Sequence, residues 1–153
     1  MQNNYQKRLS RREFYAQTPG ANEGFMSVHA AVASSGVEPA LVELVNLRVS
    51  QINGCAFCVA FHASEARKHG VSQRKLDMLP VWREASGYDP RERAALRWAE
   101  IVTGLSEQDI TDELYSASVQ TLGEETLARL TIAVALVNAW NRIATPFAFT
   151  PPA

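Results

Sequence analysis

The sequence predicts an all-α protein, a single helical domain of about six to eight helices that follows a short arm. Apolar residues recur at helical spacing along nearly the whole chain, and no run of alternating β-branched and polar residues indicates a strand. Glycine and proline separate these runs at intervals of about one helix length. A chain of 153 residues, 46% hydrophobic and 20% charged, has the size and composition of one globular domain.

Residues 1–20 are predicted to form an N-terminal arm, and residues 21–153 the helical domain. The arm is expected to contain one short helix, at about residues 10–17. Its basic residues are Lys7, Arg8, Arg11 and Arg12. Because the net charge of the whole chain is only −1, no global field recruits nucleic acid. The arm is therefore expected to be solvated or to cover a partner.

Three helices are expected in the first half of the domain. The first spans residues 25–33 and is closed by a short run of serine and glycine. The next opens near Pro39, which suits a first turn, and ends at Asn53-Gly54, a pair that favours a left-handed helix end. The third begins at or near Cys55 and is stopped by Gly70.

Four helices are expected in the second half. The clearest signal is a capping box formed by Asp89 and Glu92 around Pro90, which stands at the first helical position. The last helix is long and strongly apolar. Trp140, Phe147 and Phe149 near its end are expected either to add apolar surface for self-association or to belong to the internal core. The expected helices span about residues 72–81, 90–102, 111–122 and 124–144.

Hydrophobicity argues against a membrane protein or a secreted one. No window approaches the ~20 apolar residues that a membrane span needs. Met1–Gln17 contains no continuous apolar run that would indicate a signal peptide. We therefore expect a cytoplasmic protein. In that reducing compartment, two cysteines three positions apart are more often redox-active or metal-binding than structural.

The only two cysteines, Cys55 and Cys58, share one face of the expected helix with His62, since the three occupy positions i, i+3 and i+7. The thiols fall in the first turn, where unpaired N–H groups and the helix dipole favour a thiolate. His62 lies one turn beyond Cys58 and can form a hydrogen bond to its sulfur or take up its proton. The pattern supplies an attacking sulfur and a resolving sulfur, as a peroxide-reducing or disulfide-exchanging dithiol requires.

A metal site is the first alternative for this cluster. Two cysteines and His62, with Glu43 as a fourth ligand, would suit zinc. No second cysteine pair exists, however, and the remaining histidines, His29 and His69, fit a core or interface position and a solvated helix end. We therefore predict no metal and no other bound cofactor. A second alternative is that the cysteines act only as small buried hydrophobes.

Glu43 lies on the helix before the dithiol. If the two helices pack as an antiparallel pair, its carboxylate approaches the first turns of the next helix. There it can accept a proton from a thiol or from His62, directly or through water. On an amphipathic helix taken alone, a glutamate is usually just solvated.

Glu43 followed by Cys55-x-x-Cys58-x-x-x-His62 resembles the alkylhydroperoxidase D-like family of the carboxymuconolactone decarboxylase superfamily. The likeness covers about residues 40–144. It includes Asp89-Pro90-Arg91-Glu92-Arg93-Ala94 with Trp98-Ala99, and Asn138-x-x-Asn141-Arg142.

The resemblance implies a thiol peroxidase that needs no bound cofactor. Cys58 matches the cysteine that attacks the peroxide, Cys55 the cysteine that resolves it into a disulfide, and Glu43 and His62 the proton relay. The family implies an external dithiol reductant, such as a lipoyl protein or a peroxiredoxin partner, and a homo-oligomer, often a trimer or hexamer. One departure is Phe57, which stands where the best-characterised members carry a second histidine.

Other activities stay open on the sequence. A decarboxylase of the same superfamily would work with the cysteines incidental, although that branch generally lacks the pair. A metal-binding or redox-sensing helical module would not be an enzyme. A dithiol that only exchanges disulfides with a partner is the third alternative.

Overall fold

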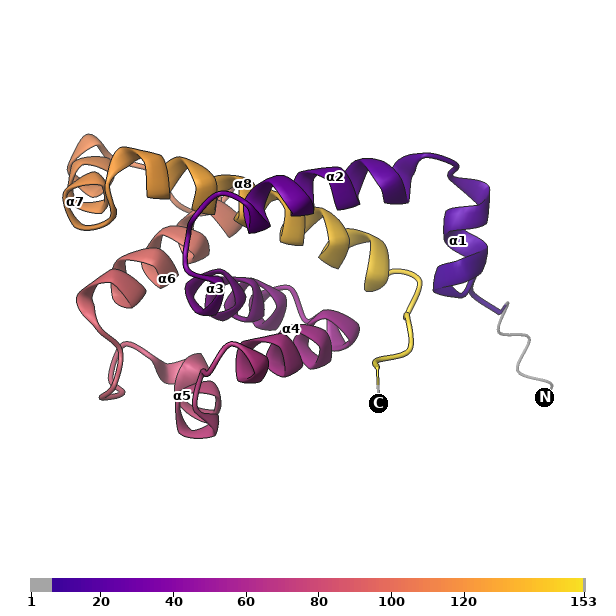
Figure 1. Cartoon of the computed structure of the whole chain (residues 1–153), viewed down its shortest axis with the longest axis horizontal. Coiled ribbons are helices and arrows are strands. Elements are labelled where there is room, and N and C mark those ends of the chain that lie inside the picture. Colours follow the sequence, from indigo (N-terminus) through magenta and orange to yellow (C-terminus); the bar gives the residue numbers. More distant parts are fainter. Residues whose placement is uncertain (1–6, 153) are drawn as a thin grey trace.

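The computed structural model describes residues 7–152, and this range is helical with no strand (Figure 1). The predicted all-α fold class is confirmed. In the described range, no helix is both long and apolar enough to cross a membrane. In chain order the elements are α1 (Arg11–Gln17), α2 (Ala21–Ala33), α3 (Pro39–Ile52), α4 (Ala56–Lys68), α5 (Gln73–Met78), a 3-10 turn (Leu79–Val81), α6 (Pro90–Thr103), α7 (Asp112–Leu122) and α8 (Glu124–Ala144).

Helix α3 is the central element of the molecule. It packs against α4, α6 and α8, which surround it in Figure 1. A surface helix buries one stripe, whereas α3 is buried nearly all round between Leu41 and Ser50. Its buried polar residues, which include Glu43 and Ser50, therefore face other helices and not solvent.

Two apolar cores lie on different sides of α3. Val45 and Val49 belong to the core shared with α6 and α8, whereas Leu44 and Leu47 belong to the core under α4 and α5. All four of these side chains are almost completely buried. Burial of a Leu or Val side chain contributes about 1.5–3 kcal/mol of hydrophobic free energy, so α3 is held from several directions.

Most predicted helix boundaries are confirmed, with two differences. Helix α2 begins at Ala21, four residues before the expected start, because the chain enters it through left-handed Gly20 with no side-chain cap that would mark the position. The helix expected at 72–81 is α5 followed by a 3-10 turn. Pro80 lies in that turn and lacks the N–H that would continue the α-helical bonding.

The two ends of the described chain meet at one end of the bundle (Figure 1). Phe14 of α1 contacts Phe147 and Phe149 of the segment after α8, with ring centroids 4.8 and 6.0 Å apart. Phe149 is only 7% exposed, so of the two alternatives for this residue, exposed apolar surface or internal core, the structure shows internal core. The C-terminal segment folds back onto the body of its own chain, which covers the ring.

A half-buried carboxylate of α6 joins this helix to α3. The side chain of Glu100, 10% exposed, accepts hydrogen bonds from Arg48 Nε at 2.7 Å and Trp82 Nε1 at 2.8 Å, and it pairs with Arg83. Burial raises the pKa of this carboxyl, but the hydrogen bonds from Trp82, Arg83 and Arg48 outweigh it, so the pKa of Glu100 lies below its ordinary value.

We expect Glu100→Gln to lower the free energy of unfolding at pH 7 by about 2 kcal/mol, because two guanidinium groups lose their charged partner. A carboxyl whose folded-state pKa is lowered stabilises the protein above its unfolded-state pKa, and this stabilisation is lost as the pH falls through the folded-state pKa. The difference between wild type and variant in urea unfolding should therefore shrink below about pH 4.

The control is Glu125→Gln, which removes an exposed i, i+4 pair with Arg129 and should leave stability nearly unchanged. A loss at Glu100 that is no larger than this control, or that does not change with pH, would contradict the assignment.

Candidate active site

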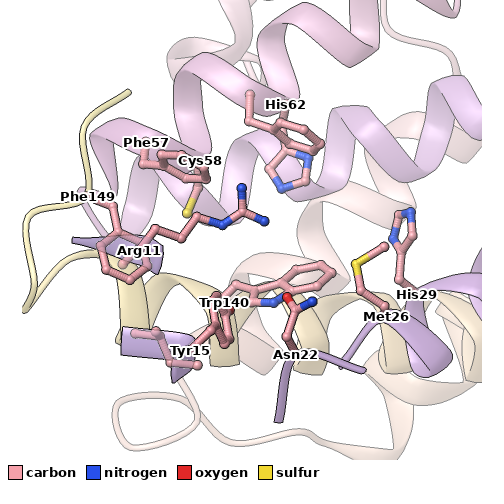
Figure 2. Close-up of a pocket in the computed structure, with 13 residues that line it drawn as sticks. Arg11, Tyr15, Asn22, Met26, His29, Phe57, Cys58, His62, Trp140 and Phe149 are labelled. Carbon is pink, nitrogen blue, oxygen red and sulfur yellow. The ribbon is translucent and has the colours of Figure 1, made fainter. Parts of the chain in front are cut away.

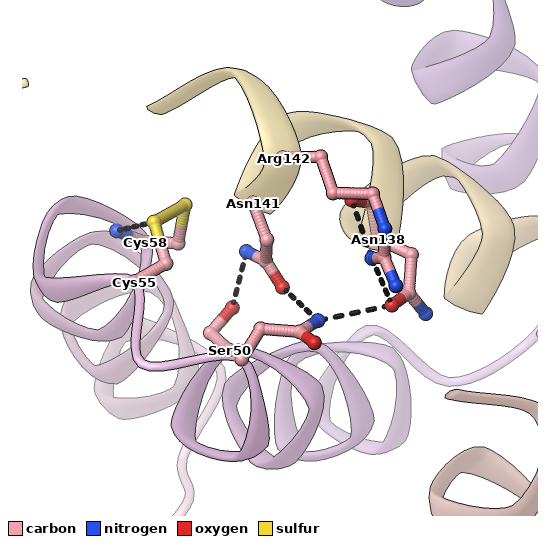
Figure 3. Close-up of a disulfide and its surroundings, with 7 residues drawn as sticks. Ser50, Cys55, Cys58, Asn138, Asn141 and Arg142 are labelled. Atoms are coloured by element: carbon pink, nitrogen blue, oxygen red, sulfur yellow. Dashed lines mark hydrogen bonds between the residues drawn. A yellow bond between two sulfur atoms is a disulfide. The ribbon is translucent and has the colours of Figure 1, made fainter. Parts of the chain in front are cut away.

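The two cysteines form a disulfide at the start of α4 (Figure 3), with Cα atoms 5.3 Å apart. Gly54, with a φ of 65°, turns the chain from α3 into this position. The backbone N–H of Cys55 donates to the carbonyl of Ser50 at 3.0 Å, and Cys55 is the N-cap of α4. Its Sγ accepts a hydrogen bond from the Cys58 N–H at 3.3 Å. The first turn of the helix is thus capped by a sulfur atom.

The two sulfurs have different surroundings. Both residues are buried, Cys55 at 1% and Cys58 at 4% exposure, and they pack with Ala144 and Phe149. Only Cys58, however, lines the cavity that opens beside α4. A molecule that enters this cavity therefore meets Cys58 before Cys55.

Glu43 and His62 form a buried pair. The Nδ1 atom of His62 lies 2.7 Å from Oε2 of Glu43, and the two residues are 4% and 7% exposed. The packing of α3 against α4 brings them together across 19 positions of sequence. This contact fixes the orientation of the imidazole and leaves Nε2 as its other ring nitrogen.

The sequence also suggested a hydrogen bond from His62 to the Cys58 sulfur. Among the described residues, no such bond is present while Cys58 is in the disulfide. The two side chains instead line the same cavity, and Figure 2 shows both at its wall. The predicted residues are thus grouped as a pair of sulfurs and a His–Glu pair, which the cavity connects.

The cavity has a volume of about 120 Å³ and a mostly apolar lining. Helices α1 and α2 close it on the side opposite α4, and α8 forms its floor with Trp140 (Figure 2). Its apolar side chains include Met26, Phe57, Phe61, Trp140, Ile143 and Phe149. Phe57, the residue that departs from the family pattern, makes an edge contact with Phe149.

A polar network ties the end of α3 to α8 next to the disulfide (Figure 3). The amide nitrogen of Asn53 donates to Asn138 Oδ1 at 2.9 Å and to Asn141 Oδ1 at 2.8 Å. Asn141, 1% exposed, donates in turn to Ser50 Oγ at 3.2 Å, and Arg142 donates to Asn138 Oδ1. Because Ser50 also holds the Cys55 backbone, this network fixes the loop that carries the dithiol.

Sequence reasoning missed two parts of this arrangement. Asn53 was interpreted only as a helix stop, although its side chain is the hub of the polar network. Arg11 was assigned to an arm that is solvated or covers a partner. The side chain is exposed, but it also lines the cavity, which the sequence did not indicate. The polar network could have been inferred from Asn138 and Asn141, which lie three positions apart on an apolar helix. Buried amide groups need hydrogen-bond partners, so such a pair indicates a network.

The residues considered as zinc ligands do not form a metal-binding cluster in the described part of the chain. Within residues 7–152, no group of three or more His, Cys, Asp or Glu side chains is placed to hold a metal ion. His69 is exposed at the C-cap of α4. His29 is half-buried on α2, with its ring centroid 5.8 Å from that of Trp140.

This helical fold, with a disulfide at the start of a helix and a neighbouring Glu–His pair, fits the family that the sequence pattern resembles. The family model of the carboxymuconolactone decarboxylase family matches residues 19–100, which is more than half of the chain. The chain belongs to this family.

Three relatives illustrate the relationship. The chain is 35% identical over 133 residues to the uncharacterized protein YdfG of Bacillus subtilis. The aligned region covers 87% of this chain and 90% of YdfG. It is 41% identical over 64 residues to the alkyl hydroperoxide reductase AhpD of Maricaulis maris, or 42% of this chain and 34% of AhpD. A crystal structure of a protein of unknown function from Agrobacterium tumefaciens matches with a TM-score of 0.88 at 35% identity, over 95% of this chain and 99% of that one. The predicted alkylhydroperoxidase D-like resemblance is confirmed.

In the reduced protein we expect iodoacetamide to alkylate Cys58 about ten-fold faster than Cys55, because only Cys58 lines the cavity. Mass spectrometry of partly alkylated protein measures the two rates. In urea the two thiols should react at similar rates, which is the control. Equal rates in the folded protein, or faster alkylation of Cys55, would contradict this description of the site.

Proposed function

We propose that this protein is a thiol peroxidase that reduces organic hydroperoxides through Cys58 and Cys55. The observation that carries the proposal is the position of Cys58, which lines an apolar cavity together with His62. The Nδ1 atom of His62 contacts the carboxylate of Glu43. A relative named alkyl hydroperoxide reductase adds support for a hydroperoxide substrate.

In the first step His62 takes the proton of the Cys58 thiol at its free ring nitrogen, and the Cys58 thiolate attacks the terminal peroxide oxygen. An S–O bond forms and the O–O bond breaks. The leaving alkoxide takes the proton from His62 and departs as an alcohol, so Cys58 becomes a sulfenic acid after losing two electrons to the peroxide. Glu43 orients the imidazole and stabilises it while it is protonated.

In the second step Cys55 attacks the sulfur of the sulfenic acid, which gives the Cys55–Cys58 disulfide and water. An external dithiol then attacks Cys58, the sulfur that lines the cavity, and Cys55 leaves as a thiolate. The Cys58 N–H, which donates to Cys55 Sγ, is placed to stabilise that leaving thiolate. The proposal includes a lipoyl protein or a peroxiredoxin partner as the class of reductant.

The proposal also includes a cytoplasmic location and a homo-oligomer. Support for self-association comes from large apolar side chains that the single chain leaves exposed, among them Met26 at 46%, Phe61 at 40% and Ile132 at 50%. These residues come from α2, α4 and α8.

Cys58→Ser should abolish peroxide consumption, because it removes the attacking sulfur. Cys55→Ser should leave a sulfenic acid trapped on Cys58, because the resolving thiol is gone. A thiol titration against added hydroperoxide, with mass spectrometry to locate the product, measures both outcomes. Unchanged activity in Cys58→Ser would refute the proposal, and activity that survives thiol alkylation would favour a decarboxylase-type reaction.

Glu43→Gln should lower the kcat for hydroperoxide reduction about 100-fold, because the imidazole loses the carboxylate that orients it and stabilises its protonated form. His62→Asn should lower kcat by a similar factor. The double variant should be no slower than the worse single variant, since residues that act as one unit are not additive.

The matched control is Glu65→Gln, which removes a carboxylate of α4 that pairs with Lys68 and should leave kcat unchanged. Losses that multiply in the double variant would show that the two residues do not act as a relay.

A further inference from the structure

The cavity beside Cys58 contains a guanidinium group that the peroxidase chemistry does not use. Arg11 reaches into it from α1, and Figure 2 shows its guanidinium end directed toward the region of Cys58 and His62. Its Cζ atom lies 5.7 Å from the centroid of the Phe57 ring. Of the described residues that line the cavity, Arg11 is the only arginine or lysine.

The described structure gives this charge no acidic partner. The lining contains no aspartate or glutamate, and no ion pair between described residues involves Arg11. The nearest acidic residue in sequence, Glu13, is engaged with Ser10 in the capping box of α1. Among the described residues the guanidinium contacts the Phe57 ring and has no acidic partner, so its N–H donors can bind solvent or an acceptor supplied by a ligand.

Arg11 is an exposed residue, and the ring of Phe57 gives its guanidinium a contact within the protein. The ring supports the guanidinium by a cation–π contact and is itself packed against Phe149. Because Phe57 immediately precedes Cys58 in α4, the charge is held at a set position relative to the sulfur. The residue that replaces the family's second histidine thus contributes a platform for a cation.

The volume and lining of the cavity indicate the size and polarity of an anionic ligand. Its volume of about 120 Å³ approaches that of the ~150 Å³ engineered cavity that binds benzene. Phe61, Trp140 and Ile143 supply apolar walls. A ring-sized apolar body therefore fits, and a planar carboxylate suits the forked donors of an arginine.

We propose that the cavity takes hydroperoxides that carry a carboxylate, with the carboxylate bound by Arg11 and the apolar body against the aromatic walls. The proposal rests on the peroxidase function for the identity of the reacting group. The carboxylate site itself is independent of that chemistry, so a ligand that contains no peroxide can test it.

The binding experiment uses the oxidised wild-type protein with 4-isopropylbenzoate and its neutral match, 4-isopropylbenzamide. Trp140 lines the cavity, whereas Trp82 and Trp98 are buried in the two cores, so tryptophan fluorescence reports occupancy. We expect the acid to bind about ten-fold more tightly than the amide, as a charge-assisted hydrogen bond provides. Arg11→Gln should abolish this preference and Arg11→Lys should retain part of it.

The matched control is Arg12→Gln, which removes the same charge from the adjacent position of α1 but not from the cavity lining. It should keep the preference of the wild type. A preference that survives Arg11→Gln, or that falls equally in both variants, would overturn the proposal, because general electrostatic attraction would then explain it.

The kinetic experiment compares the para-carboxylate and para-carboxamide derivatives of cumene hydroperoxide. We expect kcat/KM to favour the acid about ten-fold in the wild type, and Arg11→Gln to slow the acid selectively. An equal loss for acid and amide would overturn the proposal, since Arg11 would then act on the thiolate or peroxide instead. Arg11-dependent binding of the benzoate without consumption of either hydroperoxide would support the carboxylate site and count against the peroxidase function.

Discussion

The burial of α3 between two cores is the constraint on which the rest of the structure depends. A helix packed from several sides has little freedom to slide or rotate, and it carries both Glu43 and Ser50. Through Glu43 it sets the orientation of His62, and through Ser50 it holds the backbone of Cys55. The proposed reacting groups of α4 are thus positioned by a neighbouring helix whose own position is fixed by apolar packing.

The cavity, in contrast, is assembled from both ends of the chain. The floor and one wall belong to α8 and α4, while α1, α2 and the C-terminal segment close the remaining sides. Phe14 and Phe149 join these two ends. The dithiol therefore sits on the closely packed part of the molecule, whereas the proposed carboxylate site involves the N-terminal helix, which packs less against the rest of the chain. This division resembles the general pattern in which a stable scaffold carries the chemistry and peripheral segments set specificity.

Much of the fold follows from local signals in the sequence. The capping box of Asp89 and Glu92, the left-handed Gly54 and the stop at Gly70 are each short-range, and each marks a helix end in the structure. The start of α2 was misplaced because Gly20 offers no capping side chain. The pairing of Glu43 with His62 was anticipated as an approach of two helices, since a short connection implies an antiparallel pair. The positions of Arg11 and Phe149 at the cavity were not predictable, because contacts between distant parts of the chain place them there. Hydrophobic periodicity contains no information on such contacts.

The sulfur that caps α4 has a consequence for the helix itself. A helix N-terminus is stabilised in proportion to the negative charge on the atom that accepts its free N–H groups. In the disulfide, Cys55 Sγ is a weak, neutral acceptor for the Cys58 N–H. After reduction to a thiolate the same atom is a strong, charged one. The strength of the hydrogen bond in the first turn of α4 therefore depends on the oxidation state of Cys55, which couples the order of this helix end to the redox state of the two sulfurs.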